Sequence, residues 1–420
     1  MNTVLGVNHK TTRRDEMRAT LLRGIAVLDG IGDQPLVGQT ILIERERISQ
    51  IGPATDFTAE WGSDVEILDL DGMTALPGLI NCHEHLDTKH AFGSFQARVS
   101  QPAQLLTLRA FRNALIDLAS GVTTVRDMAS KEANSLAVRR AIDEGMVIGP
   151  RIITCGQALC ITGGHGHQRA WQVDGVDEAR RAARTLLRAG ADLIKVMASG
   201  GMTQVTGDLA TSAQLTVQEM RAAFDEAHRA GKPTAAHAHP PAAIRAAIEA
   251  GVDCIEHGIF LDKATAELMA SKGIAYVPTM SEGPAMVKRG SSLGRPAALV
   301  ARAADSIEPH ERALRNALDA GVTVGVGTDV LGDMVEELEL LIAAGMSPVA
   351  AIKAATSVAA RIVNVTDVGI IRPGKLADII VVRSDPLRSL EALRDVHLVI
   401  KNGKQYWPSQ VAEATGRVPV

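Results

Sequence analysis

Short segments in which apolar and polar residues alternate follow the first 18 positions of the chain. They cover residues 20–28, 39–44, 47–52 and 65–70, with turns between them. Alternation with a period of two places every second side chain on one face of a strand. The pattern predicts a small β-sandwich. Residues 1–18 mix charged and polar positions and are expected to form an N-terminal extension.

From about residue 77 the pattern changes to helices that alternate with apolar strands. Apolar spacing of i, i+3 and i+4 predicts helices over residues 104–119, 134–144, 178–189, 216–230, 241–250 and 298–319. Four of these segments lead to an Ala-Gly or Ser-Gly pair and then directly to an apolar run, with the glycines at Gly121, Gly190, Gly251 and Gly321. Glycine adopts the left-handed conformation of a helix end without steric cost, so each junction predicts a helix that returns into a strand.

Eight strand candidates can be counted from Leu79, and each is followed by a helix. Such a series predicts an α/β fold, a (β/α)8 TIM barrel over residues 77–365. Strand-like segments return at residues 375–382 and 397–404. We expect them to complete the sandwich, so that this composite domain is discontinuous and consists of residues 19–76 plus 366–420.

Composition restricts the partners and the compartment. Hydrophobic residues make up 46% of the 420 positions, and the net charge of −4 gives no reason to expect nucleic acid or a membrane as a partner. The four cysteines form no Cys-x-x-Cys pair, which favours free thiols. No signal peptide or membrane-spanning stretch is evident in the sequence. These features predict a soluble, cytoplasmic protein with a small-molecule substrate, and a barrel of this size is expected to form a homo-oligomer.

The strongest chemical signal is the His83-Glu84-His85 stretch, which follows a buried apolar run. Residues i and i+2 of a strand point to the same face, so both imidazoles are expected to project together. An isolated His-x-His is as often a pair of ordinary loop histidines. The downstream strands change that balance, because catalytic groups of such barrels lie at the C-terminal ends of strands.

Further polar side chains occupy the ends of the predicted strands. They are Lys195, His237, His239, His257 and Asp329, so that five of the 12 histidines of the chain fall at three strand ends. Neutral imidazole and carboxylate are common ligands of divalent metals, and such a metal lowers the pKa of bound water to near 7. Asp329 is a candidate both for binding metal and for moving a proton to a leaving nitrogen.

Lys195 is unusual among these residues, because an ammonium group has no lone pair with which to bind a metal. Carboxylation of its amine by CO2 would turn it into a carboxylate long enough to bridge two metals. The alternative is a structural ion pair with a neighbouring acid such as Asp208.

The combined pattern resembles the metal-dependent amidohydrolase superfamily. The resemblance rests on residues 77–85, the strand-end lysine and histidines, the Gly-Thr-Asp sequence that ends at Asp329, and residues 373–379. It covers nearly the whole chain after residue 18. Residues 162–166 and 195–201 are similar to the imidazolonepropionase-like branch, which includes Xaa-Pro and Xaa-Arg/Lys dipeptidases and the ochratoxin-hydrolysing amidase.

The resemblance implies a binuclear centre. In it, His83, His85 and Asp329 bind the more buried metal, His237 and His257 bind the second, and carboxylated Lys195 bridges both together with a hydroxide. Zinc is the expected metal, with manganese or cobalt as alternatives. His165 would lie near the substrate carbonyl or carboxylate.

Two positions depart from the family pattern. Asn81 stands where an Asp is frequent, and His239 stands where many relatives have a Tyr, which predicts that His239 contacts the substrate or that specificity has moved. His167 is a further substrate-binding candidate, although it and His239 are equally compatible with plain loop positions. Arg126-Asp127 is interpreted as a structural ion pair, and residues 281–295 as a possible mobile lid.

The resemblance implies hydrolysis of a C–N amide bond in a dipeptide, an N-acyl amino acid or an ochratoxin-like aryl amide. One alternative is a cyclic-amide hydrolase or deaminase of the imidazolonepropionase type, although those members generally lack the strand-end lysine. Lactone or carbamate hydrolysis by the same site is another alternative. A non-catalytic protein that kept the fold would be expected to have lost a ligand, and none is missing.

Overall fold

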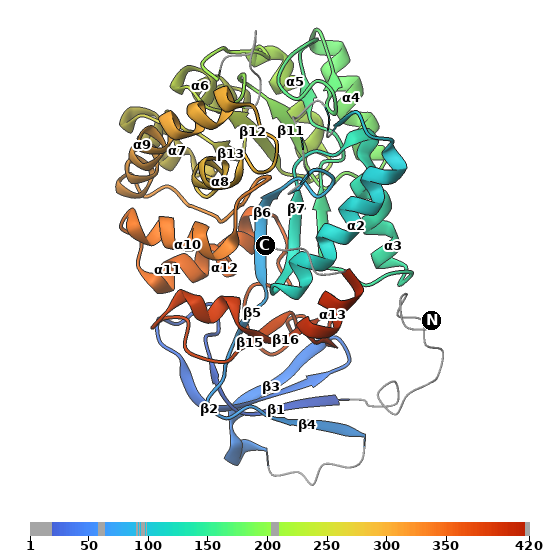
Figure 1. Ribbon diagram of the computed structural model, residues 1–420, viewed down its shortest axis with the longest axis vertical. Helices are drawn as coiled ribbons and strands as arrows, with labels where there is room; N and C mark the ends of the chain where they lie inside the picture. The colour runs from blue at the N-terminus through green and yellow to red at the C-terminus, as the bar shows by residue number, and fades with distance from the viewer. Residues whose placement is uncertain are drawn as a thin grey trace.

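The computed structural model describes residues 19–57, 64–89, 91, 93, 97, 99–202 and 210–415, with the side chains of 412–415 excluded. The predicted N-terminal extension, residues 1–18, lies outside this range. Figure 1 shows the first strands of the chain gathered at one end of the molecule, while helices surround the strands of the remainder. The last strands, β15 and β16, lie beside the first ones although they are more than 300 residues away in sequence.

One sheet joins the two ends of the chain. Its order is β17-β16-β15-β5-β1-β2-β3, and β4 pairs with β1. The strands are β1 (Ala19–Val27), β2 (Leu36–Glu44), β3 (Arg47–Pro53), β4 (Val65–Asp69), β5 (Thr74–Pro77), β15 (Ile379–Val382), β16 (Val396–Lys401) and β17 (Lys404–Tyr406). Strand β15 runs antiparallel to β5, with Ile380 opposite Leu76. The predicted return of the C-terminal segment to the N-terminal strands is therefore present.

The remaining strands form two parallel sheets, with the orders β6-β7-β8 and β10-β9-β11-β12-β13-β14. Their bounds are β6 (Leu79–Glu84), β7 (Val122–Asp127), β8 (Arg151–Thr154), β9 (Leu159–Cys160), β10 (Trp171–Gln172), β11 (Ile194–Met197), β12 (Thr234–Ala238), β13 (Cys254–His257) and β14 (Ala275–Val277). Every residue of β6, β7, β11, β12 and β13 is buried, as expected for parallel strands that are covered on both faces.

The eighth predicted strand of this series, around residues 322–327, is not a regular strand. Val324 forms a parallel bridge with Tyr276 of β14, and Asp329 forms one with Glu84 of β6. The Cys82 backbone N–H also donates to the Val326 carbonyl at 2.8 Å. The segment thus connects the edge strands of the two parallel sheets through backbone bonds, although a continuous ladder is absent from it.

Most of the helices follow parallel strands, and the last one, α13, follows β17 of the mixed sheet. They are α2 (Ala103–Ala119), α3 (Asn134–Asp143), α4 (Val176–Arg188), α5 (Val217–Arg229), α6 (Pro241–Ala250), α7 (Lys263–Lys272), α8 (Glu282–Arg289), α9 (Ala297–Asp319), α10 (Met334–Ala343), α11 (Pro348–Ala354), α12 (Ser357–Ile362) and α13 (Pro408–Thr415), with short 3₁₀ turns η1 (Ala54–Asp56), η2 (Lys131–Ala133) and η3 (Leu390–Arg394). Helices that are neighbours in sequence pack together, such as α2 with α3, α4 with α5 and α5 with α6. Among the described residues, no helix is long and apolar enough to cross a membrane.

The glycine junctions are confirmed by the backbone. Gly121, Gly190, Gly251 and Gly321 all have positive φ, between 76° and 98°. Gly251 directly caps α6 in the left-handed conformation. Each glycine ends a helix and redirects the chain toward the next strand, which brings successive strand ends to the same side of the sheets. The predicted lid segment contains α8, whose Ala285 and Met286 pack in a small buried cluster with Leu331.

Candidate active site

The end of strand β6, the residue that follows it and the 322–329 segment bring two imidazoles and a carboxylate together. His83 is fully buried and His85 is nearly so, and their ring centroids lie 5.3 Å apart. The His85 Nε2 atom is 3.5 Å from Asp329 Oδ1. Ligand atoms of His83, His85 and Asp329 lie within 4.8 Å of one another, and among the described residues this trio is the group of possible metal ligands with that spacing. The three side chains could hold one divalent cation.

A buried ion pair orients His83. Glu256 Oε2 lies 2.7 Å from His83 Nδ1, and Arg126 donates to Glu256 Oε1 at 2.7 Å. Glu256 and Arg126 were not predicted as site residues. Arg126 pairs with Glu256 rather than with Asp127, so the predicted Arg126–Asp127 ion pair was wrong. The Nδ1 bond leaves His83 Nε2 buried and without a hydrogen-bond partner. An imidazole nitrogen of this kind fits a metal, since buried polar atoms otherwise find partners.

His85 is oriented in the same way by the backbone. Its Nδ1 atom lies 3.0 Å from the Ala129 carbonyl oxygen, which leaves Nε2 on the side of Asp329. A carbonyl can only accept a hydrogen bond, so Nδ1 carries the proton and Nε2 has a free lone pair. His83, in β6, and His85, directly after it, therefore present an unprotonated Nε2 to the same place.

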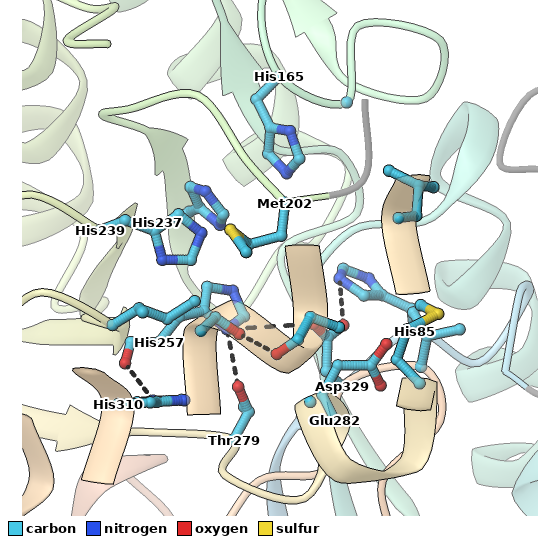
Figure 2. A pocket seen from close by; sticks show the side chains of 18 of the residues that line it. His85, His165, Met202, His237, His239, His257, Thr279, Glu282, His310 and Asp329 are labelled. Atoms are coloured by element: carbon cyan, nitrogen blue, oxygen red, sulfur yellow. Dashed lines mark hydrogen bonds and ion pairs between the residues drawn. The ribbon is translucent and has the colours of Figure 1, made fainter. Parts of the chain in front are cut away.

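The other histidines continue this cluster. The ring of His257 lies 4.6 Å from that of His83 and 4.7 Å from that of His237. The His239 ring is 4.5 Å from His237, and His165 stacks on His237 at 4.4 Å. Figure 2 shows His237, His239 and His257 on one side of the pocket and His85 with Asp329 on the other. Five separate segments of the chain thus converge on one cavity.

Burial keeps these imidazoles neutral. Desolvation lowers the pKa of His85, His237, His239 and His257 well below the usual value, and it also lowers the pKa of His83. The nearby cations Lys195 and, for His85, Arg169 act in the same direction. Neutral imidazole is the form that binds metal, so the environment favours ligation.

Left-handed backbone turns aim two of the side chains. His257 has φ 67° and Asp329 has φ 55°, a conformation that is uncommon for residues other than glycine. The His257 carbonyl accepts hydrogen bonds from Tyr276 Oη at 2.7 Å and from His310 Nε2 at 2.9 Å. These two donors hold the strained peptide in place. His310, on α9, was not predicted as a site residue, because its helical position has no relation to a strand end.

Lys195 lies in β11 and is 1% exposed. Desolvation lowers the pKa of its amine. No ion pair joins it to an acid in the described part of the chain, and Asp208, the predicted alternative partner, lies outside the described residues. A buried lysine with a lowered pKa has a larger neutral fraction, and the neutral amine is the form that reacts with electrophiles.

Asn81 has a structural role beneath the histidines. Its side-chain amide donates to Thr328 Oγ1 at 2.7 Å and to Glu84 Oε2 at 3.1 Å. Its oxygen accepts from the His83 backbone N–H at 3.2 Å. Lys89 donates to the same Glu84 carboxylate at 2.5 Å. Asn81 therefore connects β6 to the segment that carries Asp329.

One pocket contains most of the predicted residues. His85, Lys195, His237, His257 and Asp329 line it, as do the predicted substrate contacts His165 and His239. His83 lies beneath this lining. His167 does not line the pocket, and its Nδ1 atom lies 3.0 Å from the Gly164 carbonyl oxygen. Lining residues that the sequence did not single out include Arg169, Thr279, Glu282, Arg295 and His310.

Comparison with known proteins places this geometry in context. The model of the amidohydrolase family matches residues 74–406. The ochratoxinase of Aspergillus niger is 32% identical, over 93% of this chain and 87% of that protein. The crystal structure of A. niger ochratoxinase superposes with a TM-score of 0.82 at 30% identity, covering 94% of this chain and 96% of that one. A prolidase solved with N-methylphosphonate-L-proline gives a TM-score of 0.86 at 32% identity, covering 93% and 99%.

Proposed function

Because the chain belongs to the amidohydrolase family and is thus a hydrolase acting on carbon–nitrogen bonds, we propose that it is a binuclear metal-dependent enzyme that cleaves an amide bond of a dipeptide, an N-acyl amino acid or an ochratoxin-like aryl amide. The observation that carries this proposal is the convergence of His83, His85 and Asp329 within ligand distance, with His83 Nε2 left unpartnered. The names of the prolidase and ochratoxinase relatives support the choice of substrate class.

The proposal includes the architecture that holds the site. The two parallel sheets and the 322–329 segment would form a (β/α)8 barrel over residues 77–365. The mixed sheet would belong to a composite β-sandwich domain of residues 19–76 and 366–420. The bridges of the segment to β14 and β6 support closure of the barrel, and the pairing of β15 with β5 supports the composite domain.

The proposed metal ligands follow from the positions of the side chains. His83, His85 and Asp329 would hold one divalent ion, His237 and His257 would hold a second, and carboxylated Lys195 would bridge the two. Zinc, manganese and cobalt all accept this ligand set. Lys195 is buried in the same pocket without an acid partner among the described residues, which supports its modification rather than a structural ion pair.

Divalent metals in such a site would supply Lewis-acid polarisation of the substrate carbonyl and activation of water at neutral pH. The protein groups would do the rest. Asp329 would take the proton of the attacking water at a carboxylate oxygen and pass it to the leaving nitrogen. His165 and His239 would contact the substrate, and His239 Nδ1, buried and without a partner, is available for a hydrogen bond. Glu256 and Ala129 would hold the imidazoles of His83 and His85 in their tautomers.

The experiment that tests this function is a substrate screen on protein purified without chelator. The panel contains Xaa-Pro and Xaa-Arg dipeptides, N-acyl amino acids, ochratoxin A and imidazolonepropionate, with a lactone and a carbamate as further alternatives. We expect hydrolysis of a linear amide, loss of activity with a chelator, and recovery on addition of Zn²⁺, Mn²⁺ or Co²⁺. Asp329→Asn should lower kcat by at least about 100-fold, since it removes the proposed proton carrier.

Turnover of imidazolonepropionate alone would overturn the linear-amide proposal in favour of the cyclic-amide alternative. Full activity after complete metal removal would overturn the metal-dependent mechanism. Glu249→Gln is a suitable control for the substitutions, because this acid is exposed on α6.

A further inference from the structure

The pocket contains one buried cation that forms no ion pair with a described carboxylate, although the charge of Glu282 acts on it from outside ion-pair distance. Arg295 lines the pocket and is 5% exposed. Its Nη1 and Nη2 groups donate to the carbonyl oxygens of Gly93 and Ala91, the latter at 2.8 Å. Its Nε is buried and has no hydrogen-bond partner. In the described part of the chain, no carboxylate lies within ion-pair distance of Arg295.

The other cations of the pocket differ from Arg295. Arg169 has Asp87 at 3.8 Å and the Thr88 hydroxyl at 3.0 Å. Lys195 is assigned to the metal centre in the proposed function. Glu282 lines the same pocket, but one of its oxygens accepts the Leu331 backbone N–H at 2.5 Å, and it forms no ion pair with Arg295. Arg295 is therefore the pocket arginine that forms no ion pair with a described acid, and Glu282 acts on it only through its charge at longer range.

A buried guanidinium without an ion-pair partner is unfavourable. Backbone carbonyls solvate two of its nitrogens but do not neutralise the charge. Desolvation lowers the pKa of Arg295, and the charge of Glu282 opposes this effect without cancelling it. An anionic group in the pocket would compensate the charge and could use the remaining N–H. Since the guanidinium is planar and presents several donors, a carboxylate is a well-matched partner.

Part of the pocket wall is apolar and adaptable. Met197, Met202 and Met286 line the pocket together with Ile259 and Leu299. Methionine side chains are flexible and polarisable, so they accommodate apolar groups of different shapes. The pocket thus combines an apolar part with a buried guanidinium that has no ion-pair partner among the described residues.

We infer that Arg295 is a specificity-determining residue that binds a free carboxylate of the substrate, and that the substrate is an N-acyl amino acid with apolar groups. This inference rests on the proposed amide hydrolysis and refines its substrate class. Arg295 acts on binding and orientation, whereas the chemistry belongs to the metal-ligand cluster around Asp329.

The test compares an acid with a neutral compound of the same shape. N-benzoyl-L-phenylalanine carries the carboxylate, and N-benzoyl-L-phenylalaninol replaces it with a hydroxymethyl group while keeping the same scissile amide. We expect kcat/KM of the wild type to favour the acid by about 10- to 100-fold, as for a charged hydrogen bond. Arg295→Gln should reduce this ratio to near one, while Arg295→Lys should retain part of it.

Arg315→Gln is the matched control, because Arg315 is an exposed arginine on the same helix, α9, as the pocket residue Leu299. The ratio should be unchanged in this variant. A loss of packing around Arg295 would lower turnover of both compounds equally and leave the ratio intact. Equal turnover of acid and alcohol by the wild type, or an unchanged ratio in Arg295→Gln, would overturn the inference.

A binding measurement distinguishes a failure of this inference from a failure of the proposed function. If the metal-loaded wild type cleaves neither compound, thermal denaturation in the presence of each still reports affinity. Stabilisation by the acid but not by the alcohol, abolished in Arg295→Gln and kept in Arg315→Gln, would retain the carboxylate site while the proposed hydrolysis of this class fails. If Arg295→Gln does not fold, Arg295→Lys and the wild-type comparison decide the question.

Discussion

Glu256 Oε2 lies 2.7 Å from His83 Nδ1, and both side chains are completely buried. The same carboxylate is bonded to Arg126, whose guanidinium is 2% exposed. The arginine charge and the His83 bond lower the pKa of Glu256 to about 2, against the opposing effect of burial. Glu256 is therefore ionised at neutral pH and fixes the Nδ1–H tautomer of His83.

The Glu256→Gln variant tests this relationship. Removing the charge leaves Arg126 buried and uncompensated, so we expect the free energy of unfolding to fall by about 3 kcal/mol. Metal affinity should fall by about 10- to 100-fold, because the single amide oxygen of Gln carries no charge and cannot serve both His83 and Arg126 as the two carboxylate oxygens do. Chemical denaturation and metal titration followed by Co²⁺ absorption measure the two effects. Glu249→Gln, which removes an exposed acid, should change neither quantity.

The proposed bridging role of Lys195 predicts the metal content of the protein. Elemental analysis of protein purified without chelator should find about two metals per chain in the wild type and a lower content in Lys195→Ala, since the bridging ligand is lost. Addition of a short carboxylic acid such as propionate should restore part of the metal content of the variant. About one metal per chain in both proteins would contradict the bridge and favour a mononuclear site.

The burial of Glu337 predicts that the stability of the protein depends on pH. It is fully buried in α10, accepts the backbone N–H groups of Met280 and Ser281, and burial raises its pKa to about 7. A raised pKa means that the folded state binds the proton more tightly, so this contribution to stability is complete below about pH 4.5 and is lost as pH rises through 7.

The comparison is between the wild type and Glu337→Gln, which cannot titrate. From pH 5 to pH 8 the stability of the wild type relative to the variant should fall by on the order of 3 kcal/mol. Thermal denaturation at fixed metal concentration and several pH values measures this difference. A difference that stays constant over this range would show that the carboxyl of Glu337 titrates normally. The Gln side chain also loses one acceptor, but that cost does not vary with pH.

The sequence by itself determined the periodic elements. Alternating segments gave the strands of the mixed sheet, and the glycine junctions gave the helix ends, because both depend on local side-chain direction and backbone conformation. The strand-end rule also placed His83, His85, Lys195, His237, His257 and Asp329 near one pocket. The expectation that these side chains lie close together rests on the shared edge of parallel strand ends, and their roles as ligands and catalytic groups stay predictions.

Only the tertiary structure decided which side chains support that cluster. Glu256 lies next to His257 in sequence but bonds to His83, 173 residues away. Arg126 pairs with Glu256 rather than with its neighbour Asp127. His310 and Arg295 come from the α8–α9 region, where no strand end marks them. Such contacts depend on how separate segments pack and on which buried charges require partners. The local periodicity of the sequence predicts neither of these.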